Sequence, residues 1–321
     1  MSGMIVSMFS SSSSSRLCSS CSSSPSSSRT RRQRAHERTL TSRRVTVVVS
    51  SSSFVKTNND SPTSTKRVLV LGGTGYVGAA VVNALTQKPS KIISRVTSVS
   101  RRGGTSTNDV TCIPADATDP STTRRILAEA REDGEPFDAV IHCVGMLLAS
   151  DLNALASGSG SKPDEGATYD AVTRQSAVAA MDAAAELCTP SEKDGKVPFA
   201  FVSAAEAGWQ ENSNPLVPEW LEDYLRAKRA VERALASNDQ IRSVVVRPSL
   251  VYSPDRLASL PAVGAFTVAN KIGIPGIDKP VLVDDVAAAL VDSVLYGEGE
   301  PDSVLRYEAI EQRASRWRER M

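Results

Sequence analysis

From residue 67 onward, short apolar runs alternate with longer stretches in which apolar positions recur every three to four residues. The run at 67–71 (RVLVL) is typical of a strand that is buried on both faces of a parallel sheet. Similar runs recur along the chain, and a helical pattern or a polar loop separates each from the next. We therefore predict six strands, at residues 67–71, 96–100, 110–114, 139–144, 199–203 and 243–246.

Helical patterns fill most of the intervals between these runs. The longest are the alanine-rich stretch 169–187 and the stretch 221–236, and each lies between two predicted strands. Strands that alternate with helices at this spacing are typical of the α/β class with a doubly wound parallel sheet. We predict a single Rossmann-type domain with a small C-terminal portion on the substrate side. Its main helices are expected at residues 76–87, 121–131, 169–187 and 221–236.

The first 53 residues differ in composition from the rest of the chain. They contain eight arginines and one acidic residue among many serines, and such a segment cannot bury enough apolar surface to fold. This composition is typical of a mitochondrial or plastid transit peptide, and the alternative is a basic tail that stays attached. The predicted organisation is a disordered transit peptide over 1–53, a linker over 54–66, a folded domain over 67–311 and a basic C-terminal tail over 312–321.

Charge and residue counts exclude several classes of protein. Without residues 1–53 the formal net charge falls from +1 to about −6, and a mildly acidic body argues against nucleic acid as a partner. No apolar stretch reaches the roughly 18 residues of a membrane span. Of the two histidines, His36 lies in the predicted transit peptide, which leaves only His142. We therefore predict no metal site and no Ser-His-Asp hydrolase.

The segment after the first predicted strand carries the strongest signal for a ligand. It reads LGGTGYVG, and its glycines follow a strand and open a helix, which is the context in which such a pattern binds a dinucleotide. Gly72 permits the tight turn, Gly75 lets the backbone approach a pyrophosphate at the helix N-terminus, and Gly78 allows close helix–strand packing. The predicted cofactor loop comprises Gly72, Thr74, Gly75, Tyr76, Val77 and Gly78.

Ser100, Arg101 and Arg102 end the second predicted strand. Folds that prefer NAD usually place an acid here, which binds the 2′-hydroxyl of the ribose. Two arginines could instead pair with a 2′-phosphate, which favours NADP as the cofactor and leaves NAD as the alternative. The arginines could equally be two solvated surface residues.

Other strand ends supply further candidate cofactor contacts. Asp116 could accept a hydrogen bond from the adenine amino group, or it could be a simple turn or N-cap aspartate. Val144 and Gly145 would lie along the cofactor's ribose, because Gly145 permits a close approach. Pro248 would lie near the nicotinamide.

Tyr224 and Lys228 form a YxxxK pair, and residues four apart lie on one face of a helix. A lysine ammonium there can lower the pKa of the tyrosine and hold the nicotinamide ribose. The tyrosine can then act as general acid or base toward a carbonyl or hydroxyl. Ser203, at the end of the fifth predicted strand, could orient a substrate oxygen. We predict Tyr224, Lys228 and Ser203 as the catalytic residues.

From Arg67 to about Glu311 the chain resembles the extended and atypical short-chain dehydrogenases/reductases, through GGTGYVG, YLRAK and VVRPSLVY. Within that class, VIHCVGMLL, TYDAVTRQSA and VSAAEAG resemble the branch of the mitochondrial complex I NAD(P)H-binding subunit and of the dehydrogenase-like protein of coenzyme Q biosynthesis. Plastid members of the branch share much of this pattern. The chain departs from it in one respect: many extended members carry the catalytic serine two residues beyond Ser203, where this chain has Ala205.

The resemblance implies one of two roles. The first is an NADP(H)-dependent oxidoreductase or epimerase-like enzyme that acts on a small, prenylquinone-related substrate in coenzyme Q (ubiquinone) biosynthesis. The second is a nucleotide-binding scaffold without catalysis, in a respiratory or quinone-biosynthetic protein complex. In either role the expected location is the matrix side of the mitochondrion, with the plastid as the alternative. Peripheral association with a membrane is compatible with both roles.

Overall fold

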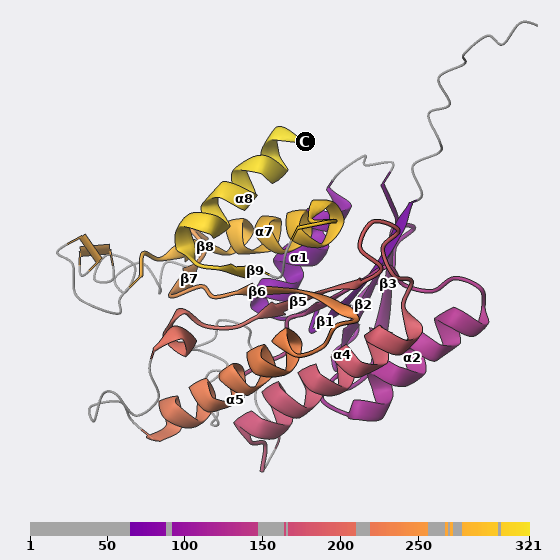
Figure 1. Cartoon of the computed structure of the whole chain (residues 1–321), viewed down its shortest axis with the longest axis horizontal. Coiled ribbons are helices and arrows are strands. Elements are labelled where there is room, and N and C mark those ends of the chain that lie inside the picture. Colours follow the sequence, from indigo (N-terminus) through magenta and orange to yellow (C-terminus); the bar gives the residue numbers. More distant parts are fainter. Residues whose placement is uncertain are drawn as a thin grey trace, which may run out of the picture. The chain divides into compact units, whose positions relative to one another are not determined.

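The structure is a computed structural model of the whole chain (Figure 1). It describes residues 65–87, 92–146, 164, 166–209, 219–255, 267–268, 270–271, 278–300 and 303–321. All of these residues belong to one compact unit, Asn59–Met321. The predicted transit peptide over 1–53 and all but the last two residues of the predicted linker lie outside the described residues.

A seven-stranded sheet forms the centre of this unit, and its strands follow the order β3-β2-β1-β4-β5-β6-β9. Every neighbouring pair is parallel, so the predicted α/β fold with a doubly wound parallel sheet is confirmed. The six predicted runs are all strands, and β9 is an addition at the edge. The strands are β1 (Lys66–Leu71), β2 (Ile93–Ser100), β3 (Val110–Pro114), β4 (Ala139–His142), β5 (Val197–Val202), β6 (Ile241–Val246) and β9 (Ser303–Leu305).

Residues of β1 alternate between two separate hydrophobic cores. Val68 and Val70 pack in the core on one face of the sheet, whereas Leu69 and Leu71 pack in the core on the other face. All four side chains are fully buried. A central strand that is buried on both faces needs a continuous apolar run. The run RVLVL therefore indicates a central position in the sheet.

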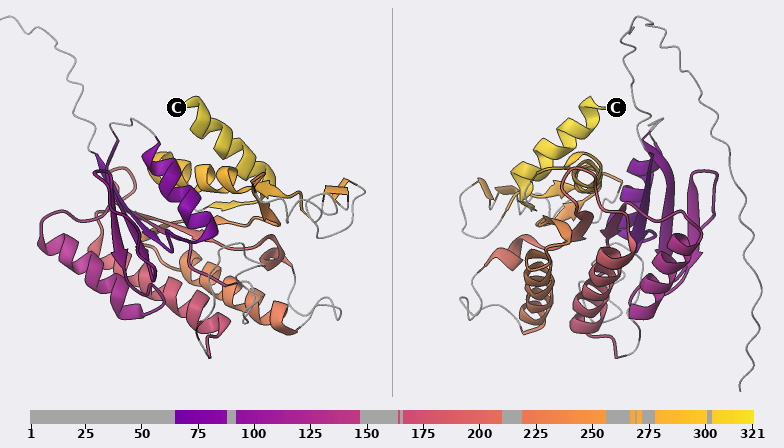
Figure 2. Two further views of the ribbon diagram at one scale, coloured as in Figure 1. Left: turned by 180° about the vertical axis from the view of Figure 1, so that it is seen from behind. Right: turned by 45° about the vertical axis from the view of Figure 1, so that its right-hand side comes forward.

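Helices cover both faces of the sheet (Figures 1 and 2). The apolar sides of three helices fill the core on one face, and three others fill the core on the opposite face. The first group is α2 (Pro120–Glu132), α4 (Ser176–Leu187) and α5 (Glu219–Ala236), and the second is α1 (Tyr76–Thr86), α7 (Val283–Tyr296) and α8 (Tyr307–Glu319). The smaller elements are a π-helical turn η1 (Asp170–Gln175), a 3₁₀ turn η2 (Ala205–Gly208) and a two-stranded parallel pair, β7 (Val251–Tyr252) and β8 (Val281–Leu282).

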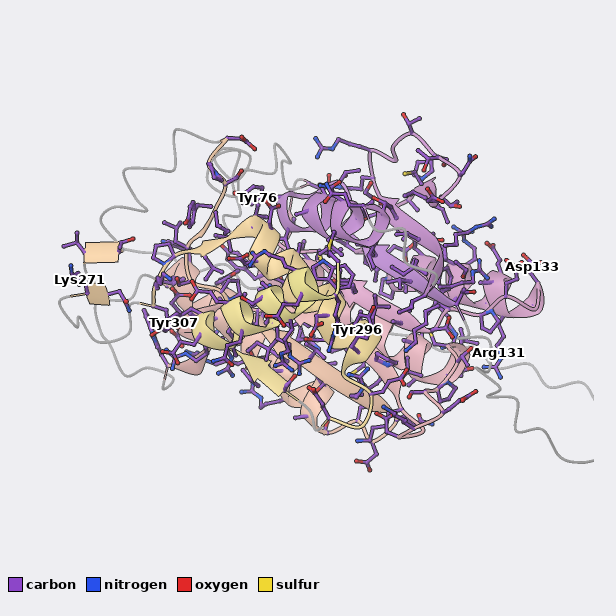
Figure 3. The ribbon with its side chains drawn as sticks, turned by 90° about the horizontal axis from the view of Figure 1, so that it is seen from above. Tyr76, Arg131, Asp133, Lys271, Tyr296 and Tyr307 are labelled. Atoms are coloured by element: carbon purple, nitrogen blue, oxygen red, sulfur yellow. The ribbon has the colours of Figure 1, made fainter. Side chains whose placement is uncertain are left out.

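The predicted basic tail over 312–321 is wrong, because α8 continues to Glu319 and packs against α7 (Figure 3). Ala314 and Trp317 are buried in the core. Arg313 and Arg320 both form ion pairs with Asp292 of α7, whose side chain is fully buried. The basic residues of this segment therefore attach a helix to the domain.

The order of the strands reverses between β1 and β4, since β2 follows β1 on one side and β5 follows β4 on the other. In open parallel sheets, ligands bind in the crevice outside the carboxyl ends of the strands at this point. Gly72 follows β1, and Cys143 follows β4. No helix among the described residues is long and apolar enough to cross a membrane.

Candidate functional site

The glycine loop makes a tight turn against the end of β4. Gly72 has a φ of +81°, a conformation that favours glycine, and its N–H donates to the carbonyl of Val99 at 2.8 Å. A Cβ on Gly72 would lie 3.0 Å from the carbonyl carbon of Cys143 and 3.1 Å from the nitrogen of Val144. The loop therefore crosses the crevice in direct contact with the backbone that follows β4.

Gly75 and Gly78 leave space for a ligand and for the helix respectively. Gly75 is the N-cap of α1 and makes no side-chain capping hydrogen bond, and no acidic residue lies in the first turn. Among the described residues, a Cβ on Gly75 would meet only the carbonyl oxygen of Gly72, at 3.1 Å, whereas a Cβ on Gly78 would collide with that oxygen. Within the described part of the chain, the positive end of α1 thus has room for a bound pyrophosphate. Thr74, Tyr76 and Val77 are half-buried around it.

The two predicted arginines occupy the centre of a tight turn after β2. Gly103 donates its N–H to the Ser100 carbonyl at 2.9 Å, and the Ser100 hydroxyl donates to the Gly103 carbonyl at 3.1 Å. The exposed Arg102 donates to the carbonyl of Thr74 in the glycine loop at 3.2 Å. Arg101 is also exposed and forms an ion pair with Asp164 at 2.6 Å. Arg102 therefore lies beside the glycine loop, and Arg101 precedes it in the same turn.

Asp116 makes a local turn after β3. One oxygen of its carboxylate accepts hydrogen bonds from the backbone N–H of Thr118 at 2.9 Å and from the Thr118 hydroxyl at 2.8 Å. The turn aspartate that the sequence left as an alternative is therefore present. The contact with adenine stays a prediction.

Lys228 joins three parts of the crevice. Its ammonium donates to the carbonyl of Val202, at the end of β5, at 2.7 Å. The Nζ atom lies 5.6 Å from the ring centre of Tyr224 and 4.7 Å from that of Phe201. A Cβ on Gly145, which follows β4, would lie 3.5 Å from the same nitrogen. The predicted Tyr224–Lys228 pair and the predicted ribose contact Gly145 thus come together in space.

Burial changes the pKa of both members of this pair. It lowers the pKa of Lys228 to about 8, so the ammonium is mostly charged at pH 7 and is lost as the pH rises further. Burial, followed by the charges of Glu206 and Tyr169, raises the pKa of Tyr224. In the protein without a ligand the phenol therefore holds its proton at neutral pH, as a general acid must.

Ser203 is engaged within the protein. Its hydroxyl donates to the carboxylate of Glu232 on α5, and Glu232 is also paired with Arg247 through two nitrogens of the guanidinium. Pro248 is buried, and its carbonyl accepts the N–H of Ala205 at 2.9 Å. The strand ends of β5 and β6 are therefore tied together here, while the roles of Ser203 toward a substrate and of Pro248 toward nicotinamide stay predictions.

Two side chains beside Tyr224 were not predicted from the sequence. Tyr169 meets Tyr224 edge to face, with 5.8 Å between ring centres. Glu206 lies close enough for its charge to act on Tyr224, and burial raises its own pKa. Within the described part of the chain, no cation pairs with the Glu206 carboxyl. The only signal in the sequence is the acid within VSAAEAG, just after the fifth strand.

Turn η2, which carries Glu206, is held in place by a buried arginine. Arg229 of α5 donates to the carbonyls of Ala207 and Trp209, each at 3.2 Å, and pairs with Glu222 at 2.9 Å. Two carbonyls and one carboxylate thus satisfy its guanidinium. This arrangement holds the backbone that directly follows Glu206, in the turn that places the carboxyl beside Tyr224.

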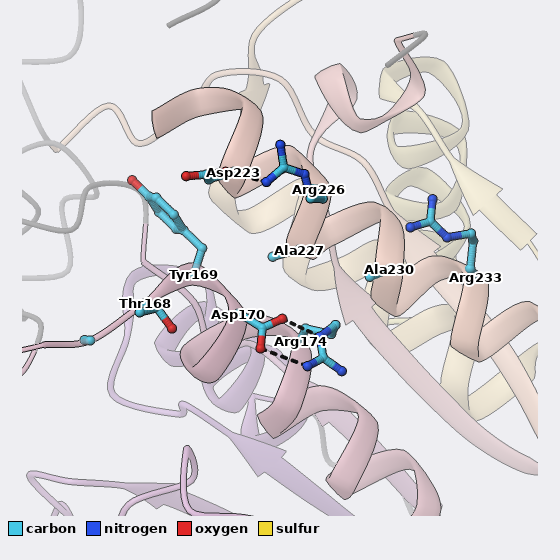
Figure 4. A pocket seen from close by; sticks show the side chains of 10 residues that line it. Thr168, Tyr169, Asp170, Arg174, Asp223, Arg226, Ala227, Ala230 and Arg233 are labelled. Atoms are coloured by element: carbon cyan, nitrogen blue, oxygen red, sulfur yellow. Dashed lines mark hydrogen bonds and ion pairs between the residues drawn. The ribbon is translucent and has the colours of Figure 1, made fainter. Parts of the chain in front are cut away.

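A cavity of about 670 Å³ lies between η1 and α5 (Figure 4). Tyr169 lines one end, and ion pairs Asp170–Arg174 and Arg226–Asp223 lie at its rim. Among the described residues, the lining includes neither the glycine loop nor Lys228. In the described residues, no group of three or more His, Cys, Asp or Glu side chains is placed to bind a metal ion.

Solved structures of similar fold include several dehydrogenases and nucleotide-binding enzymes. The enzyme WbmG of Bordetella bronchiseptica, crystallised with NAD, is 18% identical with a TM-score of 0.50, over 77% of this chain and 74% of that one. A short chain dehydrogenase family protein of Francisella tularensis is 16% identical with a TM-score of 0.51, over 78% and 99%. Aldohexose dehydrogenase of Thermoplasma acidophilum is 15% identical with a TM-score of 0.50, over 75% and 92%. At these identities the likeness confirms the fold.

A model of the NAD dependent epimerase/dehydratase family matches residues 68–273, which is more than half of the chain. The matched range contains the glycine loop, the two arginines after β2, Ser203 and the Tyr224–Lys228 pair. The dependence of this family on NAD confirms the predicted class of cofactor, a nicotinamide dinucleotide, and does not decide between NAD and NADP. By this match and by the geometry of its crevice, the chain belongs to the NAD dependent epimerase/dehydratase family.

Proposed function

We propose that this protein is an NADP(H)-dependent oxidoreductase, or an epimerase-like enzyme with the same redox chemistry. Its proposed substrate is a small, prenylquinone-related precursor in coenzyme Q biosynthesis. The observation that supports an enzyme is the convergence of Tyr224 and Lys228 with the glycine loop and the end of β4. A buried lysine beside a half-buried tyrosine at the edge of a ligand crevice costs stability, and such groups are typical of functional sites.

Each residue of the crevice would have its own role in binding the cofactor or in catalysis. The N-terminus of α1, beyond Gly75, would bind the pyrophosphate, and the ammonium of Lys228 would donate to the ribose. A bound nicotinamide would accept or supply the hydride. Tyr224 keeps its proton at neutral pH because burial raises its pKa, so its phenol would protonate a carbonyl oxygen during reduction. In the reverse direction the same oxygen would take up the proton of a hydroxyl, with the charge of Lys228 stabilising the phenolate.

A nucleotide-binding scaffold is the alternative, and one observation favours it. The hydroxyl of Ser203 is committed to Glu232, and the position two residues further on is Ala205. A protein without a substrate-orienting serine could bind the dinucleotide only to stabilise its own surface within a respiratory or quinone-biosynthetic complex. Peripheral membrane association would suit either role.

A pair of variants separates the two functions. Tyr224→Phe removes the proton donor and keeps the ring that packs against Tyr169, so an enzyme should lose about 10²-fold or more of its activity, or of its ability to rescue quinone-deficient cells. Gly75→Val fills the space left for pyrophosphate and should abolish function in either role. Tyr307→Phe, at the half-buried first residue of α8, is the matched control.

Each pattern of results rejects one function. Full rescue by Tyr224→Phe together with loss in Gly75→Val rejects the enzyme. Loss in both variants, with nucleotide binding retained in Tyr224→Phe, rejects the scaffold.

The location in the mitochondrial matrix rests on the composition of residues 1–53, and the plastid is the alternative. Cleavage is expected near residues 40–60, within roughly ten residues. N-terminal sequencing of the protein from its native organelle tests this, and finding Met1 or Ser2 on the mature protein would reject a transit peptide. Fractionation of the same cells distinguishes the two organelles.

The proposed preference for NADP rests on Arg101 and Arg102. A lost charge-assisted contact to a phosphate costs about 1.5–3 kcal/mol, or roughly 10–150-fold in affinity. Calorimetric titration should therefore show NADP⁺ binding more tightly than NAD⁺ by that factor. Equal affinities would reject the preference.

A further inference from the structure

The two arginines in the turn after β2 have different surroundings. Hydrogen bonds between Ser100 and Gly103 close the turn on both sides. A Cβ on Gly103 would also lie 3.1 Å from Pro114 of β3. Arg101 and Arg102 therefore project from a rigid turn, and their different contacts follow from their different positions within it.

Arg102 is tied to the glycine loop, because its guanidinium donates to the carbonyl of Thr74 at 3.2 Å. Arg101 instead pairs with a carboxylate from a distant part of the chain, Asp164, at 2.6 Å. A guanidinium that binds a carboxylate in this way presents the same donors that would bind a phosphate. The carboxylate of Asp164 thus lies where an anionic ligand of Arg101 would lie.

We infer that Asp164 competes with the 2′-phosphate of NADP for Arg101, and that Arg101 is the residue that distinguishes NADP from NAD. This inference rests on the proposed preference for NADP. The Arg101–Asp164 pair is exposed, at 41% and 71% for the two side chains, and exposed pairs contribute little stability. A phosphomonoester with nearly two negative charges displaces such a carboxylate readily. NAD carries no 2′-phosphate and leaves the pair intact.

The competition also connects the cofactor to the substrate side of the crevice. Asp164 begins a turn in which its carbonyl accepts the N–H of Ala167 at 3.0 Å, and Gly166 within this turn has a φ of +78°. The chain then continues directly to Tyr169, whose ring contacts Tyr224. Release of Asp164 by NADP therefore acts on the segment that leads to the proposed acid.

Calorimetric titration of the full chain with NADP⁺ and with NAD⁺ tests the inference. In Asp164→Asn, affinity for NADP⁺ should rise about two- to five-fold, which is the range of an exposed ion pair, while affinity for NAD⁺ stays the same. In Arg101→Ala, affinity for NADP⁺ alone should fall, by roughly 10–150-fold. Arg102→Ala should weaken the binding of both nucleotides alike, because it loosens the glycine loop that both nucleotides would contact.

Two controls exclude a general effect of charge. Asp170→Asn removes another exposed, ion-paired carboxylate of the same region and should leave both affinities unchanged. In the double variant Arg101→Ala/Asp164→Asn, the gain from Asp164→Asn should disappear, because a competitor acts only while its arginine is present.

The outcomes separate this inference from the preference on which it rests. Equal binding of both nucleotides by the wild type overturns both. If the wild type prefers NADP⁺ and Asp164→Asn changes nothing, or changes both affinities equally, the competition is overturned and the preference stands. A gain that persists in the double variant overturns it in the same way.

Discussion

Burial of Lys228 should make the stability of this protein rise with pH. A lysine in the unfolded chain titrates near 10.5, whereas burial lowers the pKa of Lys228 in the folded protein to about 8. Between these two values the unfolded chain binds more protons than the folded one, so the free energy of unfolding increases as the pH rises. At about 1.4 kcal/mol for each pH unit, the full window corresponds to about 3 kcal/mol.

The variant Lys228→Met removes this titration and keeps a side chain of similar length. Near pH 7 the wild type carries the cost of a buried charge but gains the hydrogen bond to the Val202 carbonyl, so the two proteins should be similarly stable. From pH 8 to 10.5 the wild type should become more stable than the variant by about 3 kcal/mol. Urea denaturation at closely spaced pH values measures this difference.

The exposed Lys279 supplies the control, because its hydrogen bond with Glu311 raises its pKa instead of lowering it. The difference between the wild type and Lys279→Met should show no rise over the same pH range. If the free energies of unfolding of the wild type and Lys228→Met follow parallel pH profiles, the prediction is refuted. If it holds, the charge that Lys228 offers to a ribose or a phenolate is lost above about pH 8, and activity should fall there.

Three further predictions test the packing of the domain. Gly78→Ala should lower the free energy of unfolding by about 1–3 kcal/mol in urea denaturation, since its Cβ collides with the carbonyl of Gly72; Gly75→Ala, which has more room, should lose less. Burial lowers the pKa of His142 to about 3, so stability should fall as the pH drops from 6.5, by up to about 1.4 kcal/mol per unit, and His142→Leu should flatten that part of the profile. Trp317→Ala should cost about 3–5 kcal/mol by thermal denaturation, whereas a residue in an unattached tail would cost almost nothing.

The centre of the sheet was predictable because its strands, such as β1, contain short apolar runs. Val68–Leu71 is fully buried on both faces, and such burial leaves a pattern that one sequence can show. Strand β9 (Ser303–Leu305) leaves no such pattern, because it is short and its middle residue, Val304, is exposed. The glycine loop was predictable for a different reason, since a positive φ and close backbone contacts restrict the residue type directly.

Helix α8 was missed because its inner face carries charge. Arg313 is almost fully buried, and it pairs with a buried carboxylate on α7, Asp292. When only apolar positions are counted, such an arginine is taken for a surface residue. The segment then resembles a polar tail. The buried partner is distant in sequence, so only the folded structure shows that the charge is compensated.

The same reasoning explains why the chemistry beside Tyr224 was only partly predictable. Tyr224 and Lys228 are four residues apart on one helix, so their spacing is visible in the sequence. Glu206 lies near Tyr224 in a turn, η2, that Arg229 of α5 holds through carbonyls that any residue would supply. A sequence pattern records side chains that must be of one type, and it cannot record a position that is set by backbone carbonyls. The acid at 206 is therefore found by following the buried arginine that holds its turn.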